Sequence, residues 1–105
     1  LSGGAAGIAL LDEAVETHRA ALEVRTRDAL PVDWALTQEN LAMAFKALAQ
    51  IDPGRRCAHL AAARIAVCEA LTVYTPEHMP YDHGTASQLR AEIESAITEH
   101  CPPAP

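Results

Sequence analysis

The chain has 105 residues, half of them apolar, and a formal net charge of −6. Its length and composition exclude a wholly disordered chain and favour one domain, which we place over residues 1–105. The scattered basic residues exclude the positive surface of a nucleic-acid-binding protein, and no apolar run approaches the roughly eighteen residues that span a bilayer.

The first predicted helix covers about residues 6–28 and follows Leu1-Ser-Gly-Gly, which we expect to be a flexible lead-in. Two apolar stripes at helical spacing run along this helix, so we expect it to be packed on two sides. One stripe is Ile8, Leu11, Val15, His18 and Leu22, and the other is Leu10, Ala14, Ala21 and Val24.

The second predicted helix covers about residues 32–51, between two joints that contain proline. Pro31 ends the first helix and is favoured in the first turn of the next one. Asp52-Pro53-Gly54 has the chemistry of a tight turn. The helix carries a narrow apolar stripe that we expect to face the core, formed by Trp34, Leu41, Phe45 and Leu48.

Two more helices are predicted, over about residues 55–75 and 81–100, with a frayed tail at 101–105. The third helix also carries two stripes and should be covered on two sides, whereas the fourth should be an outer, solvent-facing cover. The stripes of the third helix are Leu60, Ala63, Val67, Ala70 and Tyr74, and Ala58, Ala61, Ile65 and Cys68. The predicted fold is therefore all-α, with antiparallel helix pairs that form a superhelix fragment or a short bundle.

An internal repeat links the two halves of the chain. When the sequence is shifted by 49 residues, residues 10–34 align with residues 59–83. Small, apolar and proline positions match in this register, including Pro31 with Pro80. Because such units cannot bury their apolar faces alone, we expect the two copies to stack and the first and third helices to superpose.

The segment 34–74 resembles a tetratricopeptide repeat. The first helix of such a repeat carries leucine, a small residue, and then an aromatic residue three positions on, as in Leu41, Ala42 and Phe45. The second helix carries small and bulky residues in a fixed order, matched by Ala63, Val67 and Ala70. The pattern departs from the family at Ala42, where glycine is usual. The resemblance implies stacked helix pairs and a peptide-binding groove lined by the first helix of each pair.

The resemblance also implies which residues face that groove. Asn40 matches a position where some family members hold a peptide backbone or a terminal carboxylate. The alternative is that Asn40 is a partly buried polar group bonded to a neighbouring helix. Both interpretations stay open at this point. The candidate partner-binding residues are Leu36, Glu39, Asn40, Met43 and Lys46.

No combination of residues in the chain indicates catalysis, a cofactor or a metal. His78, Asp82 and His83 flank Pro80 without the second cluster that a four-ligand zinc site needs, so we expect a solvated connector there. His100 and Cys101 adjoin a proline-rich tail with no shaped cleft for a nucleophile.

The three cysteines, Cys57, Cys68 and Cys101, do not form a disulfide pattern. We expect buried free thiols and hence a cytoplasmic protein. No leader peptide is visible, and the start at Leu1 suggests that the chain is part of a longer protein.

The favoured function is a non-catalytic module that binds a peptide or protein segment. The alternative is a small regulatory or structural four-helix bundle, a self-associating fragment of a larger signalling protein. The outer stripe of the first helix has no predecessor to cover it, which makes a homodimer a further possibility.

Overall fold

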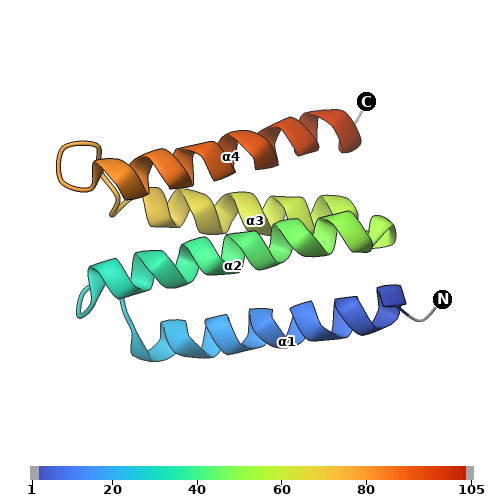
Figure 1. Ribbon diagram of the computed structural model, residues 1–105, viewed down its shortest axis with the longest axis horizontal. Coiled ribbons are helices and arrows are strands. Elements are labelled where there is room, and N and C mark those ends of the chain that lie inside the picture. Colours follow the sequence, from blue (N-terminus) through green and yellow to red (C-terminus); the bar gives the residue numbers. More distant parts are fainter. Residues whose placement is uncertain (1–2, 104–105) are drawn as a thin grey trace.

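The structure, a computed structural model, describes residues 3–103 and is helical in that part of the chain, with no strand. Its four α-helices run antiparallel in succession (Figure 1), and a short 3₁₀ turn joins the second to the third. The all-α prediction is therefore confirmed. The elements are α1 (Gly3–Val24), α2 (Pro31–Ile51), η1 (Pro53–Arg55), α3 (Arg56–Leu71) and α4 (Pro80–His100).

Each helix packs mainly on its neighbour in the chain. The α2–α3 interface is the most extensive, and α1 and α4 cover its two sides. In the described residues the backbone of α1 does not come close to that of α3 or α4, and the backbones of α2 and α4 come close only briefly. The helices therefore lie in chain order across the molecule, and both chain ends lie at the same end of it (Figure 1).

Alanine determines how closely these helices approach. Ala35 and Ala42 on α2, and Ala63 and Ala70 on α3, are completely buried. A methyl side chain lets two helix backbones come close, and larger side chains fill the space between the alanines. The predicted stripe of α2 is in this core, as is the first predicted stripe of α3. The larger core residues include Trp34, Leu41, Phe45, Leu48, Leu60, Val67, Tyr74 and Ile93.

The 49-residue repeat is visible in the two joints that precede α2 and α4. Pro31 and Pro80 each open a helix, and the preceding residues have nearly the same backbone angles: Leu30 at φ −139°, ψ 69° and Met79 at φ −138°, ψ 62°. The hydrogen bonds match as well, with N–H donors of Leu30, Trp34, Met79 and His83 bound to carbonyls of Thr26, Leu30, Thr75 and Met79. The two prolines thus occupy equivalent positions, as the repeat predicted.

The equivalence extends to the far ends of α2 and α4. Asp52 ends α2 at φ −127°, ψ 73°, and Cys101 ends α4 at φ −130°, ψ 70°. Each of these residues donates its N–H to the carbonyl four positions back, in Leu48 and Ile97. These positions are again 49 apart. Helices α2 and α4 therefore start and stop in the same way.

Several predicted boundaries were wrong for local reasons. Helix α1 begins at Gly3 within the predicted lead-in, of which residues 1–2 lie outside the described part, and it ends at Val24. Threonine side chains close the turns that end α1 and α3 early: Thr26 Oγ1 accepts from the N–H of Ala29, and Thr72 Oγ1 donates to the carbonyl of Glu69. Such local bonds compete with helix continuation.

The outer stripe of α3 is not covered as predicted, whereas the outer stripe of α1 is open, as expected for a stripe with no preceding helix in the chain. Leu10 and Val24 of α1 are 69% and 77% exposed, and Ala58, Ala61, Ile65 and Cys68 of α3 are all exposed. Since the backbones of α1 and α3 do not come close, neither helix shields these positions of the other. Both helices therefore present an apolar strip to the surroundings.

Close packing of α3 predicts that Ala63→Leu destabilises the fold by about 1–3 kcal/mol, because a completely buried methyl group has no room to grow. Ala61→Leu on the exposed side of the same helix is the matched control and should change stability by less than about 0.5 kcal/mol. Urea denaturation measures both. Equal effects in the two variants would contradict the close approach of α3 to its neighbours.

Candidate functional site

A cleft lies between α2 and α4, where these helices diverge above α3. It consists of two hollows of about 290 Å³ each, which share Lys46 and Gln50. We call it the α2/α4 cleft. Small side chains on both walls, including Ala47 and Ala96, leave this space open, and Leu60 of α3 lies at its base. Its lining residues are Met43, Lys46, Ala47, Ala49, Gln50, Arg56, Leu60, Leu89, Glu92, Ala96 and His100.

The sequence placed five candidate binding residues on α2, and the structure brings two of them into the cleft. Met43 is 48% exposed and lines the cleft with Lys46. Leu36, 49% exposed, and Asn40, half-buried, lie one to two turns earlier. Their spacing from Met43 puts all three on one helix face. The cleft therefore continues as a surface along α2.

Glu39 does not belong to that surface, contrary to its predicted place on the exposed side of α2. Its side chain is buried, and the hydroxyl of the buried Tyr74 donates a long hydrogen bond of 3.4 Å to Glu39 Oε1. Burial raises the pKa of the Glu39 carboxyl; the bond from Tyr74 opposes this rise, and the charge of Asp82 adds to it. Glu39 thus joins α2 to the α3–α4 turn.

Lys46 is held across the cleft by an ion pair. Its Nζ lies 3.1 Å from Glu92 Oε1, and the amide of Gln88 donates to the other oxygen of Glu92 at 3.2 Å. The hydrogen bond from Lys46 and that from Gln88 lower the pKa of Glu92. Both partners are partly exposed, so this pair adds little stability but sets the position of two charges at the cleft mouth.

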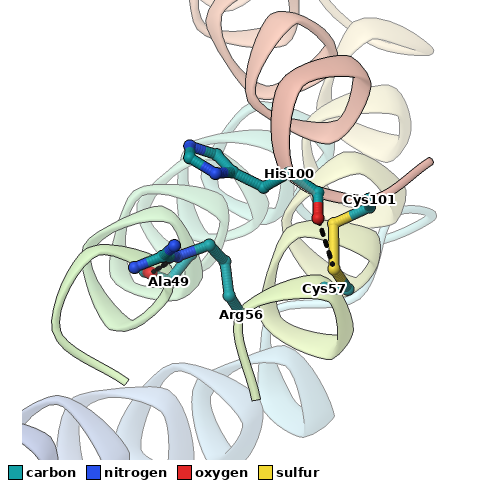
Figure 2. Close-up of a disulfide and its surroundings, with 5 residues drawn as sticks. All are labelled: Ala49, Arg56, Cys57, His100 and Cys101. Carbon is teal, nitrogen blue, oxygen red and sulfur yellow. Dashed lines mark hydrogen bonds between the residues drawn. A yellow bond between two sulfur atoms is a disulfide. The ribbon is translucent and has the colours of Figure 1, made fainter. Parts of the chain in front are cut away.

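A disulfide closes one end of the cleft. Cys57 in the first turn of α3 is bonded to Cys101 just after α4, with 5.7 Å between their Cα atoms (Figure 2). Arg56 and His100 precede the two cysteines and line the cleft, and Arg56 Nε donates to the carbonyl of Ala49 at 2.9 Å. Figure 2 shows the Arg56 and His100 side chains reaching to the same side of the disulfide.

The expectation of buried free thiols without a disulfide was wrong, because Cys57 and Cys101 are bonded. Cys57 is exposed, Cys101 is half-buried, and Cys68 is free and exposed. The expected fraying of residues 101–103 was also wrong at Cys101, while residues 104–105 lie outside the described part. The repeat contained a signal for this disulfide. It makes Cys101 equivalent to Asp52, which ends α2 beside the start of α3, so it places Cys101 near Cys57.

A second groove lies on the opposite side of α2, between α1 and α3. Phe45 forms its floor, with the guanidinium of Arg19 5.4 Å above the ring and His59 stacked at 6.3 Å. His59 Nε2 lies 2.8 Å from Asp52 Oδ2. An acid–histidine pair can support a nucleophile, but the residues that line this groove include no serine or cysteine. The pair therefore joins the end of α2 to α3.

The other candidate sites from the sequence do not form a larger cluster of functional side chains in residues 3–103. This part of the chain holds no group of three histidine, cysteine or acidic side chains placed to bind a metal. His78 Nδ1 lies 3.3 Å from Thr75 Oγ1 within the α3–α4 turn. None of the described helices has the length and apolar character that crossing a bilayer requires.

Comparison of the chain with protein-family models, with curated proteins and with solved structures finds no match.

Because Glu39 is buried, we expect the substitution Glu39→Gln to change the stability of the fold by an amount that depends on pH. Because the folded-state pKa is raised, the stability contributed by Glu39 is fully present below its unfolded pKa and is lost as pH rises through the folded pKa. Glutamine keeps an oxygen for the Tyr74 hydroxyl and carries no charge. The variant should be more stable than the native chain at neutral pH, and the difference should shrink as pH falls toward 4.5, the ordinary glutamate value.

Denaturation at a series of pH values measures this difference. Glu77→Gln, in the exposed α3–α4 turn, is the control and should show no such trend. A Glu39→Gln variant that is less stable than the native chain at neutral pH would place an ionised Glu39 in a favourable environment instead.

Proposed function

We propose that this chain is a non-catalytic interaction module that binds a segment of a protein partner in the α2/α4 cleft. The observation that carries the proposal is the open cleft itself, with Met43, Lys46 and Gln50 on its α2 wall. The antiparallel helix pairs and the repeated joints are also consistent with a tetratricopeptide-like module, and we keep that family as part of the proposal.

The chemistry of the surface favours a peptide over a small molecule. The amides of Asn40 and Gln50 can each donate to and accept from a partner backbone. Met43 offers an adaptable apolar contact, and Leu36 extends that contact along α2. The cleft is shallow and open, whereas small-molecule sites enclose most of their ligand.

A second candidate is self-association through α1. The exposed Leu10 and Val24 form part of an apolar strip that no other described element covers. Burial of such a strip against a second copy would remove apolar surface from water. This candidate corresponds to the alternative of a small structural or regulatory bundle, and light scattering over a range of concentrations distinguishes a dimer from a monomer.

From the sequence we expected a cytoplasmic protein, because we expected free buried thiols. Free buried thiols no longer support this compartment, because Cys57 and Cys101 are bonded. Disulfides in the cytoplasm are usually transient, catalytic or redox-sensing. A cytoplasmic location therefore requires that this bond is made and broken during the life of the protein.

A peptide selected from a random-sequence display library on the oxidised protein provides the probe for the cleft. The double change Asn40→Ala with Lys46→Ala should weaken its binding by at least about 1 kcal/mol, since amide and charged contacts are lost together. Neither residue is in the buried core, so the fold should survive. Calorimetry gives the affinities, and circular dichroism checks the fold.

The matched control is Arg64→Ala with Ile65→Ala, on the exposed side of α3. It should leave the affinity unchanged. A loss confined to this control would move the binding site to the groove between α1 and α3, which Ile65 lines. Failure to enrich any peptide would overturn the proposed function.

A further inference from the structure

Helix α4 has a weaker apolar attachment than α2 and α3. It buries only Ala86, Leu89 and Ile93 completely or nearly so, whereas α2 and α3 bury many more side chains. Toward its C-terminal end only Ala96 and Ile97 are half-buried, and the last turn is exposed. The end of α4 therefore depends on a contact other than core packing.

The Cys57–Cys101 disulfide supplies that contact. It joins the residue after α4 to the first turn of α3 across a sequence separation of 44 residues. The same end of α4 forms one wall of the α2/α4 cleft through Ala96 and His100. The contact that holds the end of α4 in place therefore also sets the width of the cleft between His100 and the α2 wall.

The bond is placed where a thiol reagent can reach it. Cys57 is exposed, and Cys101 is half-buried. A thiolate attacks a disulfide sulfur directly, so access to one sulfur is sufficient for exchange. Cys68 lies on the same helix as Cys57, three turns or about 16 Å further along, too far to exchange with this bond in the folded chain.

We propose that the Cys57–Cys101 disulfide is a redox latch on the α2/α4 cleft, which holds its α4 wall in the binding position when oxidised and releases it when reduced. The proposal rests on the proposed function of the cleft and adds its regulation. The first turn of α3 is a rigid anchor for the latch, because Leu60 and Ala63 beside it are buried in the core.

The opening step is a two-electron exchange with a dithiol reductant. One thiolate of the reductant attacks a sulfur of the protein disulfide, the Cys57–Cys101 bond breaks, and a mixed disulfide forms. The second thiolate of the reductant displaces the protein sulfur, and the two departing protein thiolates take up two protons. The products are two protein thiols and one oxidised dithiol.

The latch acts on α4 alone. Helix α2 has an independent attachment at the equivalent position, where Asp52 is paired with His59 at 2.8 Å. Reduction removes no contact of α2. The proposal therefore predicts that the last turns of α4 loosen locally, beyond the general loss of stability that opening a 44-residue loop brings to the whole fold.

The experiment uses the full chain with Cys68→Ser, which removes the exposed third thiol. Three forms are compared: oxidised, reduced with dithiothreitol, and the double variant Cys57→Ser with Cys101→Ser. Hydrogen exchange followed by mass spectrometry reports on α4 and α2 separately. Calorimetry reports the affinity for the peptide selected on the oxidised protein.

We expect exchange in the last two turns of α4 to rise on reduction at least tenfold more than exchange in α2, which shares only the general loss of stability. The peptide affinity should fall about fivefold or more, the lower end of typical coupling between two sites, and should return on reoxidation. The serine double variant should behave as the reduced form in both measurements.

Three results would overturn the latch. One is unchanged exchange of α4 on reduction, and another is an equal loss of protection in α4 and α2, which would make the bond a general staple. The third is an unchanged peptide affinity, which leaves the proposed function intact. If no peptide is enriched on any form, the proposed function fails, and the latch fails with it.

Discussion

The close packing of α2 against α3 is the interaction on which the rest of the structure depends. Buried alanines on both helices bring their backbones together, and Leu48, Leu60 and Val67 fill the space around them. Because each helix packs on its chain neighbours, α1 and α4 are added to the two sides of this pair (Figure 1). This order of helices leaves two grooves on opposite sides of the α2–α3 pair. One groove lies between α1 and α3, and the other lies between α2 and α4.

The C-terminal ends of α2 and α4 are both attached to the N-terminal turns of α3. Asp52, at the end of α2, is paired with His59, and Cys101, at the end of α4, is bonded to Cys57. Asp52 and Cys101 are equivalent in the repeat, so one structural position has a polar attachment in one copy and a covalent attachment in the other. The polar attachment belongs to the helix with the larger buried face, and the covalent one to the helix with the smaller.

Helical periodicity and the repeat were sufficient to predict the fold class, the core stripe with Phe45, and the equivalent joints at Pro31 and Pro80, because these depend on spacing along one helix or on local turn chemistry. Glu39 was misplaced because only the tertiary contact with Tyr74 buries it. The pairing of Cys57 with Cys101 could not be read from irregular spacing, since it requires the end of α4 to be placed against the start of α3. The outer stripe of α3 was expected to be covered, but amphipathic spacing does not specify whether a partner helix is present in the same chain.

Chemical-shift mapping of the isotope-labelled, oxidised protein with a selected peptide tests most directly whether the α2/α4 cleft holds a partner segment. We expect the largest changes at Met43, Lys46 and Gln50, with smaller ones along α2 toward Asn40 and Leu36. Changes concentrated at Arg19, Phe45 and Ile65, in the groove between α1 and α3, would contradict binding in the cleft.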